Sequence, residues 1–233
     1  MNYTKTIVCF ANSRKIAGRC VAGKEWQDGK VGEWVRPVSN RPTHEISEEE
    51  LRYQDGRDPQ LLDIIEISCN EPQPLVYQRE NHVIAPHHHW KCVGRFEWKN
   101  IQVWLDKPSN LWGLGESSYS GLNNRVIIGQ EDGSSLYLVQ VDHLSLLVGP
   151  KAPKYKDSKR AVQGGFMYQN INYRMDATDP VIERQYLNKA DGQYDIANPV
   201  ICVSLSDPHQ AASNQPFYYY KLIAAILYPE RFQ

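Results

Sequence analysis

Long apolar stretches are absent from this chain, and the longest uninterrupted one, Leu222–Tyr228, has seven residues. A membrane-spanning helix needs about 18 consecutive apolar residues, so we expect no membrane partner. The N-terminal residues MNYTKTIVCF lack the basic start, apolar core and small-residue cleavage site of a signal peptide. These absences predict a protein that is neither membrane-inserted nor exported.

Cysteine is scarce, odd in number and widely spaced, which argues against a disulfide framework. The five cysteines are Cys9, Cys20, Cys69, Cys92 and Cys202. Several of them lie in apolar runs, where reduced core thiols are expected. This pattern favours a cytoplasmic location.

Sequence motifs of the common enzyme classes are also missing. There is no G-x-S-x-G nucleophile elbow, no Walker A loop and no dinucleotide-binding glycine pattern. The run His87–His89 suggests zinc, but the nearby residues do not complete a four-ligand set of usual spacing. We therefore predict no catalytic residue, no metal ligand and no cofactor, while the sequence leaves metal binding by these histidines open.

Two acidic patterns keep a metal-dependent hydrolase as an alternative. Glu97-Trp98-Lys99 has the final part of an Asp…Glu-x-Lys site, with Asp63 as the nearest upstream aspartate. Such a site holds magnesium with carboxylates and uses lysine to poise water. Asp63 lies in an apolar run, where contact with backbone donors is the simpler expectation. A second group, Asp176, Asp179 and Glu183, has no suitably placed lysine.

Charge is nearly balanced overall, with a formal net charge of −1, but it is unevenly distributed. Residues 1–41 hold eight Lys/Arg against three Asp/Glu, whereas residues 42–66 hold two against eight. Residues 151–160 hold five against one. Any electrostatic footprint for a polyanion is therefore local.

Short β-branched and aromatic runs separated by glycine-containing turns dominate the first third of the chain. Such runs predict strands, here at residues 5–11, 19–25 and 33–38. Ser47 and Glu50 form the pattern of a capping box, which predicts a short helix. Residues 61–68 then predict a buried strand.

The second half repeats the order of three strands, a helix and a strand, without repeating residues. Asp179-Pro180 predicts the helix start, and the strands are expected at residues 135–148, 160–168, 171–176 and 198–205. Between the halves we expect a short helix at residues 98–106 and an irregular segment at residues 108–124. Residues 217–228 fit either a closing strand or a terminal helix.

A helix between the third and fourth strands of a small β unit is typical of the five-stranded OB barrel. The predicted fold class is mainly β with short helices, built as two tandem OB-like five-stranded barrels packed together. The predicted domains are a first OB-like unit at residues 1–97, a helix plus irregular connector at 98–134, and a second OB-like unit at 135–233. The alternative is a single α+β domain with a mixed sheet.

Several strings also resemble a known family. They are ANSRK-x-x-GRCVAG followed by W-x-RPVS, and then LLDIIEI, QRENHVI, SSLYLVQVD, TDPVIERQY and YYKLIAAI. Over nearly the whole chain they resemble the bacterial dual OB-containing domain family. The resemblance implies two fused OB folds and a nucleic-acid or nucleotide-binding role in bacterial conflict, or defence, systems. It implies no established chemistry.

The first candidate site is the basic turn near the N-terminus. In an OB barrel, strands 2 and 3 and the loops after strands 1 and 4 form the usual ligand face. Asn12, Arg14 and Lys15 fall at the first of these loops, and Arg19 begins the second strand. The alternative for Asn12 is that it satisfies the turn backbone.

Trp34 and Arg36 form the second part of this candidate site. They are two residues apart on one expected strand and therefore share a face. The indole can stack on a base while the guanidinium holds its phosphate. The alternative is that Trp34 is core and Arg36 pairs with the acidic stretch that follows.

Polar residues after the fourth strand are expected to line the same face. Arg79, Asn81 and His82 offer hydrogen bonds to base edges or phosphate; the alternative is an ordinary polar loop. In the second unit, Arg174 and Arg184 are the corresponding candidates. A basic run could guide a polyanion there or simply be a solvated loop: Lys151, Lys154, Lys156, Lys159 and Arg160.

Together these patterns predict a non-catalytic protein that binds nucleic acid or a nucleotide, most simply a single strand. The resemblance adds a bacterial defence setting. The first alternative is an interaction module that docks a partner ATPase or nuclease. The second is the hydrolase described above. DNA, RNA and nucleotide ligands all remain open, as do the oligomeric state and the number of binding units.

Overall fold

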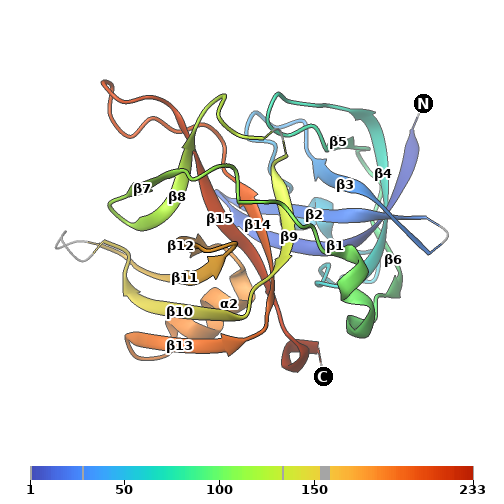
Figure 1. The fold of residues 1–233 in the computed structure, drawn as a ribbon. Coiled ribbons are helices and arrows are strands. Elements are labelled where there is room, and N and C mark those ends of the chain that lie inside the picture. Colours follow the sequence, from blue (N-terminus) through green and yellow to red (C-terminus); the bar gives the residue numbers. More distant parts are fainter. Residues whose placement is uncertain (1, 28, 133, 153–157, 233) are drawn as a thin grey trace. The chain divides into compact units, whose positions relative to one another are not determined.

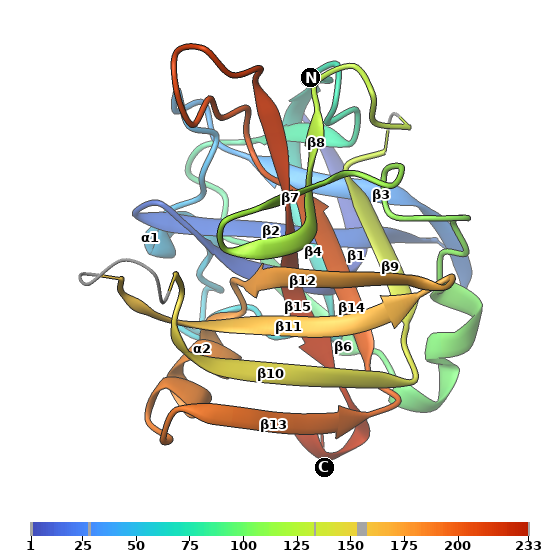
Figure 2. The same ribbon diagram turned by 60° about the vertical axis from the view of Figure 1, so that its left-hand side comes forward.

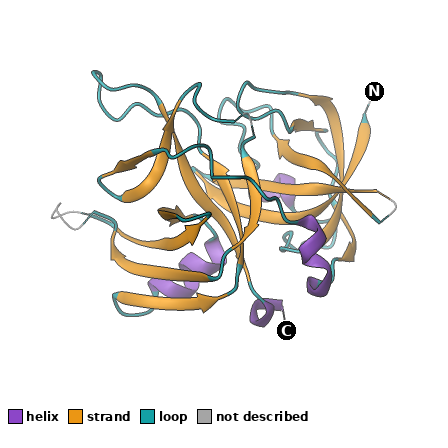
Figure 3. Cartoon of the chain, in the orientation of Figure 1, coloured by secondary structure: helices purple, strands orange, loops and turns teal. Residues whose placement is uncertain are grey.

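The computed structural model describes residues 2–27, 29–132, 134–152 and 158–232. The chain divides into two compact units, Met1–Leu105 and Asp106–Gln233. Strands account for most of the regular structure and the helices are short (Figure 3). Each unit has its own sheet, so the predicted mainly β fold class is confirmed and the single mixed sheet is excluded.

Five strands of the first unit close into a ring. They follow the order β1-β2-β3-β5-β4, and β4 returns to β1; β3 and β5 are parallel and the other neighbours antiparallel (Figure 1). The strands are β1 (Tyr3–Lys15), β2 (Gly18–Gln27), β3 (Lys30–Val38), β4 (Asp63–Pro72) and β5 (Asn81–Ile84), with β6 (Lys91–Arg95) added beside β4. A short helix, α1 (Glu48–Leu51), lies between β3 and β4, as in an OB barrel.

Local signals for α1 are present as the sequence predicts. The Ser47 hydroxyl accepts from the Glu50 N–H at 3.2 Å, and the Glu50 carboxylate accepts from the Ser47 N–H at 2.9 Å. This reciprocal capping box satisfies backbone donors that a four-residue helix cannot satisfy internally.

The second unit closes through a broken strand. Its order is β10-β11-β12-β15-β14, while β13 pairs with β10. The strands are β9 (Leu136–Gln140), β10 (His143–Pro150), β11 (Arg160–Tyr168), β12 (Ile171–Ala177), β13 (Gly192–Ala197), β14 (Val200–Leu205) and β15 (Tyr218–Leu227). Only Asn198 and Pro199 separate β13 from β14, and Asn198 has a φ of 50°. Read as one interrupted strand, β13 and β14 complete a second five-stranded ring.

Helix α2 (Pro180–Leu187) lies between β12 and β13, the position that α1 has in the first unit. Asp179 caps it as predicted, since its carboxylate accepts from the N–H groups of Val181 and Ile182 at 3.1 and 3.3 Å. At the other end, the Arg160 guanidinium donates at 2.8 Å to the carbonyl of Leu187, the last residue of the helix.

The structure corrects several secondary-structure predictions for the second unit. Residues 108–124, expected to be irregular, contain β7 (Glu116–Ser118) and the start of β8 (Gly121–Ile127), which form a hairpin (Figure 2). Residues 135–148 form two strands, β9 and β10, rather than one. Residues 217–228 are mainly the strand β15. The boundary between the two compact units falls between Leu105 and Asp106, and the predicted domain bounds, including the connector 98–134, stay a prediction.

No helix within the part of the chain that the structure describes is both long and apolar enough to cross a membrane.

Candidate nucleic-acid interface

The end of the β1–β2 hairpin concentrates positive charge. Arg14 lies directly opposite Arg19 and Lys15 opposite Gly18. Directly opposed residues on an antiparallel pair point to the same face, and like charges there are destabilising. Glu48 offsets part of this repulsion, with its carboxylate 3.7 Å from the Arg19 guanidinium. The predicted basic turn therefore exists as a compact cationic hairpin end.

The tip of this hairpin is exposed and conformationally unusual. Ile16 is 71% exposed and has a φ of 42°, a region that β-branched residues rarely occupy. Strained residues of this kind tend to occur at functional positions. An exposed apolar side chain thus lies between the cations of β1 and β2.

Asn12 connects β1 to a loop instead of satisfying the turn. Its amide donates to the Pro59 carbonyl at 2.8 Å. Its Oδ1 atom is buried and receives no hydrogen bond from the described residues. Asn12 therefore supports the hairpin from its base and is only half-exposed.

Arg36 is buried in an ion pair. Its side chain is 4% exposed, with Nε 3.1 Å from Glu80 Oε1, and Nη1 donates to Cys20 Sγ at 3.6 Å. The Arg36 backbone N–H also donates to the Glu80 carbonyl at 2.8 Å. The carboxylate partner is thus Glu80, not the acidic stretch after Arg36 that the sequence alternative named.

The segment around β5 is mostly turned inward. Asn81, which is fully buried, lies opposite Arg36 and donates to Gln78 Oε1 at 3.3 Å. His82 lies 2.6 Å from the Tyr3 hydroxyl, and burial lowers the pKa of its imidazole. Arg79, by contrast, is exposed in the loop before β5. Arg79 therefore faces solvent, whereas Asn81 and His82 make their contacts within the first unit.

Trp34 is half-buried in an aromatic cluster. Its ring meets Phe10 edge-on at 6.3 Å between centroids, and Lys24 Nζ lies 5.3 Å from the ring centre. Lys24 is itself buried and donates to the Trp104 carbonyl at 2.6 Å. Sequence reasoning missed Lys24, because only the pairing of Lys24 with Trp34 reveals it.

Predicted site residues of the second unit lie on different elements. Arg174 is on β12, where its Nε atom is buried without an acceptor among the described residues. Arg184 is on α2 and exposed, and its carbonyl accepts from Asn188 Nδ2 at 2.9 Å. No contact between the two arginines is seen in the described part of the chain.

Two residues of the basic run at 151–160, Lys151 and Arg160, make contacts within the second unit. Lys151 forms an ion pair with Asp176. Arg160 pairs with Asp191 at 2.7 Å and donates to the carbonyls of Leu187, at the end of α2, and of Lys189. Lys159 is exposed, whereas Lys154 and Lys156 lie outside the described residues.

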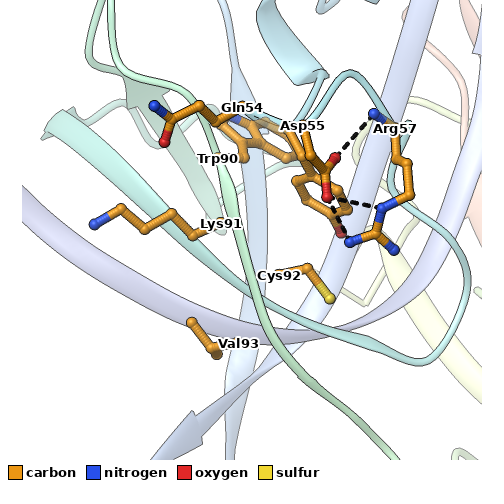
Figure 4. Close-up of a pocket in the computed structure, with 8 residues that line it drawn as sticks. Gln54, Asp55, Arg57, Trp90, Lys91, Cys92 and Val93 are labelled. Atoms are coloured by element: carbon orange, nitrogen blue, oxygen red, sulfur yellow. Dashed lines mark hydrogen bonds and ion pairs between the residues drawn. The ribbon is translucent and has the colours of Figure 1, made fainter.

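A surface hollow of about 480 Å³ opens in the first unit between β6 and the loop after α1 (Figure 4). Arg57 pairs with Asp55 at 2.7 Å and lies over the Tyr53 ring. The residues that line it are Tyr53, Gln54, Asp55, Arg57, Trp90, Lys91, Cys92 and Val93. Because Asp55 already neutralises Arg57, this cation is a poor anchor for an anionic ligand.

The carboxylate considered for hydrolysis is already satisfied by protein donors. Asp63 accepts from the Tyr53 hydroxyl, the Gln60 N–H and Arg95 Nη1, each at 2.9 Å. Lys99 pairs with Glu97 at 2.8 Å. The hydrolase alternative therefore gains no support from this geometry.

Histidines 87–89 are exposed in the loop before β6. His88 Nδ1 lies 2.8 Å from the Pro86 carbonyl. Across the described ranges, no three His, Cys, Asp or Glu side chains converge as metal ligands would.

A Ser, His and Asp group on β10 and β13 is a surface network that sequence reasoning missed. Ser145 Oγ donates to Asp195 Oδ1 at 2.8 Å, and His143 Nε2 lies 3.1 Å from the same oxygen. His143 Nε2 also faces Ser145 Oγ, at 3.2 Å. A catalytic triad uses different ring nitrogens for serine and aspartate, so this arrangement does not form one. The hydrogen bond from Ser145 helps to lower the pKa of Asp195.

Lys221 on β15 is a buried lysine in a run of apolar residues, so the sequence pattern did not single it out. It is 1% exposed, its Nζ donates to the Gly113 carbonyl at 3.4 Å, and it lies 5.3 Å from the Tyr173 ring centre. Burial disfavours the charged form and lowers the pKa of Lys221 to about 8. The ammonium group therefore destabilises the folded protein at neutral pH.

We predict that the difference in free energy of unfolding between Lys221→Met and the wild type, called the gap below, becomes smaller as pH rises. Below pH 8 the lysine is charged in both states, so the wild type bears the full desolvation penalty. Between pH 8 and 10.5 the folded protein releases the proton first, and wild-type stability rises by roughly 3 kcal/mol. Urea unfolding of both proteins at pH 7 and 10.5 measures the gap. An unchanged gap contradicts a lowered pKa, and comparing two proteins cancels the shared tyrosine titrations.

Comparison with known proteins agrees with this architecture. The family model described as "Dual OB-containing domain" matches residues 5–226. No curated protein matches the chain. Because the match spans nearly all of both units, the chain belongs to the dual OB-containing domain family.

Proposed function

We propose that the protein binds single-stranded nucleic acid, or a nucleotide, at the end of the β1–β2 hairpin, without chemistry on the ligand. The observation that carries this proposal is the direct opposition of Arg14 and Arg19 beside Lys15. Opposed cations destabilise an isolated hairpin, whereas a phosphate chain compensates them. The loop after strand 1 is also part of the usual OB ligand face.

Each predicted residue has a specific role in this proposal. Arg14, Lys15 and Arg19 contact phosphates, and the exposed Arg79 adds a cation from the loop before β5. The other candidates in the first unit support the strands that carry these cations: Asn12, Trp34, Arg36, Asn81 and His82. Ile16, at the tip, provides an apolar surface for a base.

We predict that the variant Arg14→Ala/Lys15→Ala/Arg19→Ala weakens binding to a fluorescent single-stranded oligonucleotide at least about tenfold, or 1.4 kcal/mol. Each phosphate contact on a single strand contributes about −0.7 to the slope of log K against log salt. Loss of the three cations should therefore flatten that slope by about 2. Anisotropy titrations at several salt concentrations measure both quantities.

A matched control separates the hairpin from general charge. Arg57→Ala/Lys91→Ala/Lys99→Ala also removes three cations from the first unit, all of them exposed, and should leave the slope nearly unchanged. Equal effects of the two variants would mean that binding is diffuse. Failure of the wild type to bind at low salt would refute the nucleic-acid function.

We extend the proposal to a bacterial defence setting on the family resemblance of the motifs alone. A conserved neighbouring gene for a nuclease, helicase or ATPase is the expected genomic context. Its consistent absence from related genomes would contradict this setting without affecting the binding proposal.

A further inference from the structure

The β7–β8 hairpin lies against the second and third strands of the second ring, β11 and β12. Leu122 on β8 is paired with Arg174 on β12, and the Asn123 amide donates to the Asn172 carbonyl at 2.9 Å. Figure 2 shows the hairpin beside β12, with β11 and β10 following in order. In OB folds these two strands form the usual ligand face.

The side-chain directions show which face of β11 the hairpin covers. A Cβ atom on Gly164 would lie 2.3 Å from Ile223 Cδ1 and 2.9 Å from Leu144 Cδ1, so position 164 faces the core. Successive residues of a strand point to opposite faces, so Gln163 faces outward. Gln163 is nevertheless only 7% exposed, and its amide donates to the Ser120 carbonyl at 2.5 Å. The hairpin therefore covers the outer face.

The tip of the hairpin, residues 118–124, contacts β11 and β12 mainly through polar groups, whereas residues 125–127 of β8 pair with β15. Gln163 bonds to Ser120, and Asn123 bonds to the backbone of β12. Within the hairpin, Asn124 is 4% exposed and bonds to Ser118 through both its oxygen and its nitrogen. Water can replace polar contacts, so each contributes only about 0.5–1.5 kcal/mol net. Such a cover can leave far more easily than an apolar one.

Arg174 on β12 points to the same outer face, because its neighbours Tyr173 and Met175 are buried in the core, and one of its donors is unsatisfied within the described part of the chain. Arg174 Nε is buried and has no acceptor among the described residues. A buried donor without a partner destabilises the protein by about 1–3 kcal/mol, and more when it is charged. A phosphate oxygen would satisfy this donor, because guanidinium and phosphate groups match in geometry.

We propose that the outer face of β11 and β12 is a second, covered binding face for a phosphate-bearing chain, with Arg174 as its anchor and the tip of the β7–β8 hairpin, residues 118–124, as its removable cover. The ligand class rests on the proposed function of the first unit. The cover itself follows from the contacts of Gln163, Ser120 and Asn123.

Gly121→Ala is the substitution that opens the cover. Its new Cβ would lie 2.2 Å from Asn124 Nδ2 and 2.6 Å from the Arg174 carbonyl oxygen. The hairpin must therefore move away from β12. Gly192→Ala is the matched control, because nothing lies within 4 Å of the Cβ it adds. Asn123→Ala is a second, milder opener: it removes the bond to β12 and also places alanine at a φ of 48°, which alanine disfavours.

The expected result has two parts. Hydrogen exchange of the amides at residues 118–124 should quicken about tenfold or more in Gly121→Ala, but not in Gly192→Ala. Titration with a single-stranded oligonucleotide should show one more bound strand per chain in Gly121→Ala than in the wild type. Adding Arg174→Ala should abolish this extra binding. Asn123→Ala should show the same changes to a smaller degree.

Two outcomes separate this inference from the proposed function. If the wild type binds nothing but Gly121→Ala binds through Arg174, the covered face is supported and the hairpin-end site of the first unit fails. If exchange quickens in either opener without any extra bound strand, the covered face is refuted, whatever the wild type binds. Unchanged exchange in both openers would refute the removable cover itself.

Discussion

Asp179→Ala is expected to lower the free energy of unfolding by about 3–5 kcal/mol, the usual effect of removing one partner of a buried ion pair. Asp179 is 2% exposed. One carboxylate oxygen caps α2 through Val181 and Ile182, and the other accepts from the Ile226 N–H at 3.1 Å. The Arg231 guanidinium pairs with the same carboxylate, 2.5 Å away. Truncation thus uncaps the helix and leaves the largely buried Arg231 guanidinium without its carboxylate partner.

The comparison with Asp179→Asn separates the cap from the charge. Asparagine is as good a helix cap as aspartate. Any decrease in the free energy of unfolding of Asp179→Asn therefore reports the lost ion pair with Arg231. Asp191→Ala is the control, since Asp191 pairs with Arg160 at an exposed position, where such pairs contribute about 0–1 kcal/mol. Urea unfolding followed by circular dichroism measures all three variants. A loss for Asp179→Ala no larger than that for Asp191→Ala would show that the buried pair is unimportant.

Local signals predicted the fold well because they act within a few residues. The capping box at Ser47 and the cap at Asp179 each require only neighbouring backbone groups, and both form as expected. Together with the β-branched runs, they place a helix between the third and fourth strands of each unit. That order is sufficient to predict the OB topology.

Elements whose pairing is distant in the sequence were missed. The short strand β13 pairs with β10, and β8 pairs with β12 and β15. Neither has a strong apolar alternation of its own, so periodicity could not reveal it. The break at Asn198-Pro199 also concealed that β13 and β14 act together as one strand of the ring.

The candidate site was only partly predictable for the same reason. The local sequence pattern predicts Arg14 and Lys15 in a loop after the first strand, whereas both lie at the end of β1, with Arg14 exposed. It cannot predict the burial of Arg36, which depends on Glu80 from a distant loop. Nor can it predict Lys24, whose position follows from pairing with Trp34.

Glu80→Ala is expected to lower the free energy of unfolding by about 3–5 kcal/mol, because Arg36 would be left buried without its carboxylate partner. Replacing both charges by apolar residues of similar volume is often neutral or stabilising. The double variant Arg36→Met/Glu80→Leu should therefore recover most of the loss. Urea unfolding of both single variants and the double variant completes the cycle. A double variant as unstable as Glu80→Ala would mean that the ion pair is not the source of the effect.

The same double variant decides what Arg36 does for binding. Sequence reasoning predicts a phosphate contact for Arg36, whereas its side chain is 4% exposed and held by Glu80. If Arg36 only supports β3, the folded double variant should bind an oligonucleotide with unchanged affinity and salt slope. If Glu80 gives way and Arg36 reaches a phosphate, the slope should flatten by about 0.7. We expect the first result, because releasing Arg36 would leave a buried carboxylate behind, and breaking such pairs is strongly unfavourable.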